Sequence, residues 1–267
     1  MRQIRKIRET YRTVRKYRTM ISFMALKNLK VSVIQTVLGK LWLLLEPLSH
    51  MIIYYFIIVI VFKAGPRYGI NPFVFIMMGL SHFLFLQKAV NAAGSSILSR
   101  QSILMQLKIE PVVFICIDYY KSCIDFAIFF AIYLFFYLKF GPQIPENVIF
   151  YPFILAVLFF LAYNLSIISA CLVVVLRDVR NMVAIFMRIL MYMSPVIYSI
   201  EFIPQQFREF YLYNPLSCLF ALFHWSVFNA PCPPSGPIYS MAGFTLMTFI
   251  LAHLSYNFLK PTFTKVL

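Results

Sequence analysis

The chain has 267 residues, of which 61% are hydrophobic and only 12% are charged, with 24 basic residues against 9 acidic ones. An ordinary soluble domain is about 45–50% apolar and about 25% charged. This composition excludes a soluble globular protein, because there is too little polar surface to cover a water-soluble core. We therefore expect an all-α integral membrane protein, and the position of the basic residues favours a membrane surface over nucleic acid as their partner.

The first 30 residues predict a basic amphipathic helix at the cytoplasmic surface of the membrane. They hold ten of the basic residues, and Glu9 is their only acid. Over residues 2–21, apolar side chains recur at steps of three and four: Ile4, Ile7, Tyr11, Val14, Tyr17 and Ile21. Such a helix lies in the interface with its apolar stripe in lipid, and a solvated basic tail is the alternative. The candidate headgroup contacts on its other face are Arg5, Arg8, Arg12 and Arg15.

Six apolar stretches long enough to cross about 30 Å of hydrocarbon follow. They cover residues 34–62, 72–91, 112–138, 148–176, 181–200 and 238–259. Residues 203–229 are also apolar, but Asn214-Pro215 interrupts them, and the part after the proline is short for a span. If the N-terminus, Lys260 and Lys265 all stay inside, the number of spans is even. We therefore expect six transmembrane helices, with 203–229 forming a re-entrant or interfacial helix pair on the outer side, before the last span.

Polar residues inside the predicted spans are the first candidates for function, because such residues are costly in hydrocarbon. They are Glu46, His50, His82, Lys88, Asp118, Lys121, Asp125, Arg188, His224 and His253. Glu46 and His50 share one helical face. The steps from Asp118 to Lys121 and Asp125 predict an intrahelical ion pair, with a proton relay as the alternative. Arg188 could meet a phosphate group or pair with a carboxylate.

Aromatic side chains are the second group of candidates. Most of the 29 phenylalanines and 17 tyrosines are expected to face lipid or the membrane interfaces. Rings that face an internal pathway would suit sugars, whose C–H faces pack on aromatic rings while tyrosine hydroxyls exchange hydrogen bonds. The tyrosines that we expect there are Tyr54, Tyr55, Tyr119, Tyr120, Tyr192 and Tyr198.

Motifs for catalysis, nucleotides and metals are missing from the sequence. There is no G-x-S-x-G, no H-E-x-x-H and no G-x-x-x-x-G-K-[ST]. The five cysteines form no CxxC and no Cys/His ligand spacing, so we expect no metal site. We predict no catalytic residue on this chain, and cysteines that are packed and inert. A disulfide between Cys218 and Cys232 on the outer face is the alternative for those two.

Four local motifs, taken in order, resemble those of ABC-2 type permeases, and more narrowly the polysaccharide-export permeases for capsule, O-antigen and teichoic acid. Leu-Gly-Lys-Leu-Trp at 38–42 runs into Leu-Glu-Pro at 45–47, and Glu-Pro-x-x-His at 46–50 is closer to capsule exporters. Arg-Asp-Val-Arg at 177–180 leans toward O-antigen and teichoic acid exporters. Ser-Pro-Val-Ile-Tyr at 194–198 precedes Ile203-Pro204 and Asn-Pro-Leu at 214–216. Residues 98–111 depart from the family pattern.

The resemblance implies an arrangement of parts. Residues 1–30 would be the interface helix, 31–267 the ABC-2 transmembrane domain, and 203–229 the outer gate helices. A coupling helix at about 98–110 would seat in a groove of a separate ATPase. Its apolar knob and rim charges would be Ile103, Leu104 and Leu107, with Arg100, Lys108 and Glu110. Candidate channel or substrate contacts would be Glu46, His50, Arg188 and the six tyrosines named above.

The resemblance also implies partners. The chain would form a homodimer with two copies of the ATPase, which carries ATP and Mg, so this chain has no cofactor and is not itself an enzyme. It would move a lipid-linked polysaccharide across the bacterial inner membrane, with both termini cytoplasmic and with periplasmic and outer-membrane export proteins as further partners. No nucleic acid is expected. The alternatives are an ABC-2 exporter of a drug or small lipid, and a membrane-embedded acyl- or glycosyltransferase using His50, Asp118 or His224.

Overall fold

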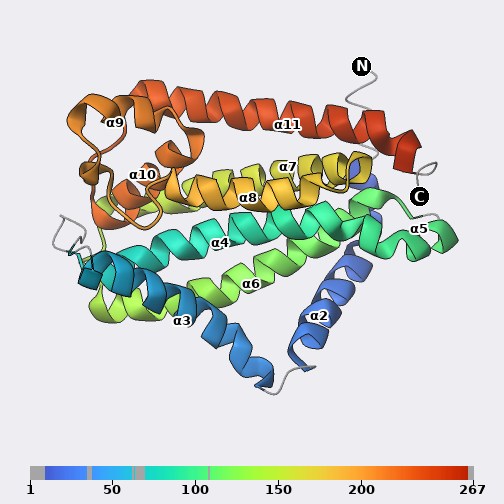
Figure 1. The fold of residues 1–267 in the computed structure, drawn as a ribbon, viewed down its shortest axis with the longest axis horizontal. Helices are drawn as coiled ribbons and strands as arrows, with labels where there is room; N and C mark the ends of the chain where they lie inside the picture. The colour runs from blue at the N-terminus through green and yellow to red at the C-terminus, as the bar shows by residue number, and fades with distance from the viewer. Residues whose placement is uncertain (1–9, 35–37, 62, 64–69, 108, 264–267) are drawn as a thin grey trace.

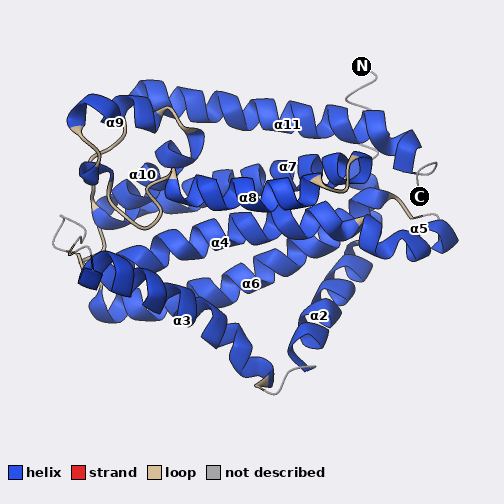
Figure 2. Ribbon diagram, in the orientation of Figure 1, coloured by secondary structure: helices blue, strands red, loops and turns tan. Residues whose placement is uncertain are grey.

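The computed structural model describes residues 10–34, 38–61, 63, 70–107 and 109–263, and within these ranges it is helical and contains no strand (Figure 2). Residues 10–16 are helical. The helices that follow are α2 (Arg18–Ile34), α3 (Trp42–Tyr55), α4 (Pro72–Ser96), α5 (Gln101–Leu107), α6 (Pro111–Phe140), α7 (Tyr151–Val175), α8 (Val179–Tyr192), α9 (Gln205–Leu212), α10 (Pro215–Phe228) and α11 (Ser235–Phe263) (Figure 1). Short helical turns are η1 (Gly39–Leu41), η2 (Phe56–Val61), η3 (Leu98–Arg100), η4 (Glu146–Phe150) and η5 (Ile200–Phe202), of which η2 is a π-helix that extends α3.

Asn-Pro pairs begin two of the helices. The side chain of Asn71 accepts a hydrogen bond from the backbone N–H of Phe73 at 3.0 Å, and Asn214 accepts one from Leu216 at 3.1 Å. Proline fits the first helical position because its missing N–H would have no helical partner there. Asn214-Pro215 is therefore the start of α10 as well as an interruption of the apolar stretch.

Four helices are long and apolar enough to cross a membrane: Pro72–Ser96, Pro111–Phe140, Glu146–Val175 and Ser235–Lys260. They correspond to the predicted spans at 72–91, 112–138, 148–176 and 238–259. The predicted first span, 34–62, begins too early, since α2 ends at Ile34 and the apolar helix that follows is Leu45–Val61. The predicted fifth span, 181–200, ends early because α8 stops at Tyr192, just before Ser194-Pro195. Hydropathy alone does not register either break.

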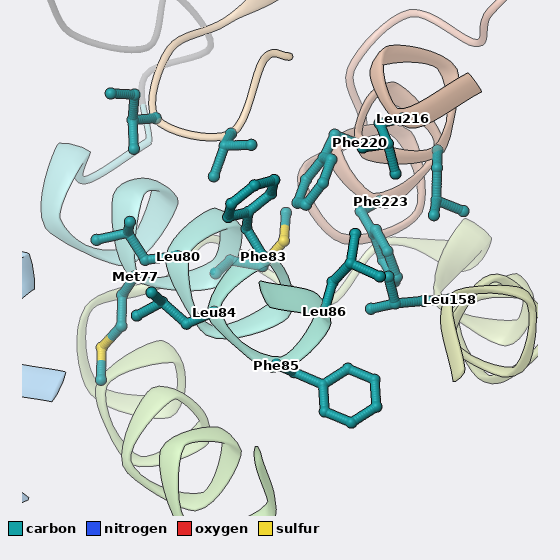
Figure 3. Close-up of a cluster of buried hydrophobic side chains, with 14 of the residues drawn as sticks. Met77, Leu80, Phe83, Leu84, Phe85, Leu86, Leu158, Leu216, Phe220 and Phe223 are labelled. Atoms are coloured by element: carbon teal, nitrogen blue, oxygen red, sulfur yellow. The ribbon is translucent and has the colours of Figure 1, made fainter. Parts of the chain in front are cut away.

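The core forms around α4, which lies between α6 and the pair α7 and α8 (Figure 1). Large aromatic side chains from α4 and α10 meet there, including Phe83 and Phe220, with ring centroids 6.2 Å apart (Figure 3). Gly79 of α4 allows a close approach, because a Cβ atom at this position would lie 1.7 Å from the carbonyl oxygen of Val196. The absence of a side chain at Gly79 therefore seats the turn after α8 directly on α4.

The N-terminal helix turns its apolar stripe toward the protein. Val14, Tyr17 and Ile21 pack in a buried cluster with residues of α6 such as Val113, and Arg12 is exposed. The prediction that this stripe faces lipid is wrong for these three side chains, because they cover the first turns of α6. Arg15 is also exposed, whereas Arg5 and Arg8 lie outside the described residues.

The cysteines are free. Cys218 is buried in α10 and Cys232 is exposed in the loop after it, so the alternative of a disulfide between them is not realised.

Candidate functional site

A polar pocket of about 490 Å³ lies between α3, α4 and α6. Three pairs of helical positions line it, each pair spaced by three or four residues, so both members face the same side of their helix. Two aromatic rings and one glutamine also line the pocket. These residues are Glu46 and His50, Lys88 and Asn91, Lys121 and Asp125, with Trp42, Phe129 and Gln87.

The charges in the pocket are paired. Lys88 Nζ lies 2.8 Å from Glu46 Oε1, which joins α4 to α3, and 5.2 Å from the ring centroid of Phe129. Lys121 Nζ lies 4.0 Å from Asp125 Oδ2, one helical turn along α6. This second pair confirms the predicted intrahelical ion pair. Both lysines keep free donors, because an ammonium group has three N–H bonds.

His50 takes its orientation from its own helix. Its Nδ1 donates to the carbonyl oxygen of Glu46 at 2.8 Å, which leaves Nε2 as an acceptor in the neutral ring. Asn91 presents a buried Oδ1 with no hydrogen-bond partner among the residues that the structure describes. The lysines therefore keep unused donors, and the wall of the pocket holds an unused acceptor in the buried Oδ1 of Asn91.

Asp118 does not pair within its own helix. Its two carboxylate oxygens accept hydrogen bonds from Arg100 at 2.6 and 2.7 Å, and Arg100 also donates to the carbonyl oxygen of Ser96 at 3.2 Å. The part of the prediction that placed Asp118 in an intrahelical pair is wrong. The partner lies 18 positions away in η3, so no helical periodicity could have indicated it.

The predicted coupling segment is mostly turned inward. Leu104 is 8% exposed and packs in the same buried cluster as Val113, and Ile103 is partly buried against it. Glu110 pairs with Lys260 of α11 at 3.1 Å. The side chain of Leu107 and all of Lys108 lie outside the described residues. Among the side chains of α5 that the structure describes, those of Ser102 and Gln106 are exposed, and a role of this segment in docking stays a prediction.

Three of the predicted tyrosines gather where α3, α8 and α9 meet. The hydroxyl groups of Tyr54 and Tyr192 lie 3.4 Å apart. Tyr198 donates to the carbonyl oxygen of Tyr192 at 2.8 Å and also contacts the hydroxyl group of Tyr211. Arg188 is exposed on α8, one turn before Tyr192.

The other three tyrosines lie elsewhere. Tyr55 packs edge-on against Phe73, with ring centroids 6.0 Å apart. Tyr119 donates to the carbonyl oxygen of Phe159 at 2.8 Å. Together with Tyr120 it lines a separate pocket of about 560 Å³ under the N-terminal helix. The predicted contact residues thus fall into distinct places in this single chain and do not form one continuous lining.

The transferase alternative named His50, Asp118 or His224 as the residue that would act, and the structure places the three in different surroundings. His50 lies in the pocket, Asp118 pairs with Arg100, and His224 is buried against Phe75, with ring centroids 4.3 Å apart. These surroundings give the three residues no shared site. Among the described residues, no group of three or more His, Cys, Asp or Glu side chains could hold a metal ion.

Comparison with known proteins gives the chain relatives along almost its whole length. No family model matches the sequence. The chain is 22% identical over 265 residues to the O-antigen export system permease protein RfbA of Myxococcus xanthus, covering 98% of this chain and 99% of the relative. Two such permeases of Klebsiella pneumoniae are 24% identical over 244 residues and 25% identical over 195 residues, covering 90% and 72% of this chain and 92% and 74% of the relatives. These relatives confirm the resemblance that the four motifs predicted.

Proposed function

We propose that this chain is the channel-forming membrane subunit of an ATP-driven exporter that moves a lipid-linked polysaccharide across the bacterial inner membrane. The observation that carries the proposal is similarity to O-antigen export permeases over 98% of the chain. The names of the relatives favour O-antigen over capsule as the class of polysaccharide. The four long apolar helices agree with a multi-pass transport subunit.

Two further crossings complete the proposed six-span topology. The 14 residues of α3 continue into the 6 residues of η2 without a break. At about 1.5 Å per residue they reach about 30 Å, which is the thickness of the hydrocarbon core. The 14 residues of α8 reach only about 21 Å. The turn after α8, together with α9 and α10, would fill the outer part of that crossing as a re-entrant gate, and both termini would be cytoplasmic.

A second copy of the chain and two ATPase subunits complete the proposed assembly. The ATPase would carry ATP and Mg, because this sequence holds no nucleotide-binding motif. The exposed face of α5 would receive the push from the ATPase. Periplasmic and outer-membrane proteins would continue the export route. The basic residues of the N-terminal helix, Arg12 and Arg15 among those described, would meet lipid headgroups.

The test is deletion of the gene followed by complementation. Loss of surface polysaccharide, with lipid-linked chains accumulating inside, is the expected result, and the wild-type gene restores export. The tagged protein should co-purify with the ATPase in equal copies, and a catalytically dead ATPase should block export. Unchanged surface polysaccharide in the deletion strain would refute the proposal and would favour an exporter of a drug or small lipid.

A further inference from the structure

We propose that the pocket between α3, α4 and α6 binds a neutral sugar unit of the exported chain. This inference rests on the proposed function, because it takes a saccharide as the transported molecule. It goes further by placing a contact in one defined pocket and by excluding the phosphate end of the carrier lipid from it.

The charge of the pocket argues against an anion. Lys88 is neutralised by Glu46 at 2.8 Å, and Lys121 lies beside Asp125 at 4.0 Å. The charges of the two lysines are thus balanced by those of the two carboxylates. A phosphate group that reached either lysine would stand close to a carboxylate and be repelled by it.

The hydrogen-bonding groups argue for hydroxyls. Lys88 uses one of its three N–H bonds on Glu46, while Asn91 offers a buried acceptor without a partner among the described residues. His50 adds a second acceptor at Nε2, because Nδ1 donates to its own helix. A hydroxyl group both donates and accepts, so a sugar ring with several hydroxyls can satisfy donors and acceptors in the same pocket.

The aromatic rings and the size of the pocket agree with a sugar as its ligand. Trp42 is 47% exposed at the edge and Phe129 lines the interior. Sugar C–H faces pack on such rings. The volume of about 490 Å³ lies in the range of about 300–1,000 Å³ for small-molecule sites. In Figure 1, α3 leans away from α6 toward its first residues, and the residues of α3 that line the pocket, Trp42, Glu46 and His50, belong to this part of the helix.

The chain provides a reporter for the test, because it has only two tryptophans. Trp225 packs against Phe150, with ring centroids 5.2 Å apart, and does not line the pocket. In Trp225→Phe, Trp42 is the only tryptophan that this chain contributes, and the same complex carrying Trp42→Phe as well gives the background signal of the ATPase. The purified complex with the ATPase is titrated with a neutral oligosaccharide released from the surface polysaccharide of the same strain, and separately with inorganic phosphate.

We expect a saturable change in Trp42 fluorescence with the oligosaccharide and none with phosphate. Asn91→Leu should raise the Kd at least tenfold, whereas Asn147→Leu, in η4 and outside the pocket, should leave it unchanged. If Trp225→Phe does not fold, the fluorescence of the wild-type protein minus that of Trp42→Phe gives the signal of Trp42 instead.

The inference is overturned by a saturable response to phosphate, by oligosaccharide binding that Asn91→Leu leaves intact, or by no response in a Trp225→Phe complex that still exports polysaccharide in cells. In the last case the proposed function stands and the pocket is not the sugar site. If the deletion strain keeps its surface polysaccharide, the proposed function itself fails, so the two failures are distinguishable.

Discussion

Asp118→Asn should destabilise the protein markedly, because it removes the charge from one side of an inward-facing ion pair. The carboxylate of Asp118 accepts two hydrogen bonds from Arg100 at 2.6 and 2.7 Å, and the two side chains are 12% and 15% exposed. Removing one partner of a buried pair costs about 3–5 kcal/mol, because the other charge remains without compensation. The residual exposure places this pair at the lower end, at about 3 kcal/mol.

Thermal unfolding of the purified protein in detergent measures this effect. For a chain of this size, a loss of 1 kcal/mol lowers the Tm by about 2–3 °C, so we expect a decrease of about 6–9 °C. The matched control is Lys260→Gln, which removes another ion pair among the described residues, the one between Lys260 and Glu110. That pair, with Glu110, is 3.1 Å long and 44% and 30% exposed. Its loss should cost about 1 kcal/mol or less.

A double-mutant cycle separates the pair from the individual side chains. Arg100→Met alone should also destabilise, but combined with Asp118→Leu it should cost less than the sum of the single changes, since an apolar pair leaves no charge unmatched. The reasoning is refuted if Asp118→Asn lowers the Tm no more than Lys260→Gln does. Strict additivity in the cycle would refute it as well.

Two other substitutions follow from close packing. Gly79→Ala should destabilise the protein by about 1–3 kcal/mol, because the new Cβ would lie 1.7 Å from the carbonyl oxygen of Val196. Gly243→Ala, whose Cβ would have nothing within 4 Å, should be neutral or stabilising in the same thermal assay. Equal effects of the two substitutions would contradict the close approach at Gly79. Leu104→Ala should destabilise the isolated permease by about 2–5 kcal/mol, because Leu104 is buried. Gln106→Arg, on the exposed face of α5, should leave the Tm unchanged and reduce co-purification of the ATPase. A fully stable Leu104→Ala variant that loses the ATPase would show that Leu104 faces the partner.

Hydropathy predicted the fold wherever an apolar stretch coincides with one helix. This holds for α4, α6, α7 and α11, whose bounds agree with the predicted spans to within a few residues at most ends. It failed where a turn lies inside an apolar stretch, as at Gly39, which has a φ of +50° between α2 and α3. A window average responds to side-chain transfer energy and not to backbone direction, so it placed the start of the first span at the end of α2 instead of after the turn at Gly39.

The candidate site was predicted only in part. Glu46 and His50 were found because they share one helical face, and Lys121 pairs with Asp125 for the same reason. The pairing of Lys88 with Glu46 depends on how α4 packs against α3, which local spacing does not encode. Asn91 follows Lys88 by three positions, so a search of α4 for polar residues at helical spacing could have added it to the site.

The ion pairs differ in how long each charged residue waits for its partner while the chain is being synthesised. Arg100 and Asp118 lie 18 positions apart, so a nascent hairpin can neutralise both as soon as α6 leaves the ribosome. Glu110 pairs with Lys260 in the last helix. At a synthesis rate of about 5–20 residues per second, Glu110 waits on the order of 10–30 s for its partner. We expect the charge of Glu110 to stay in contact with water until Lys260 has been synthesised, because an unpaired carboxylate is costly in hydrocarbon.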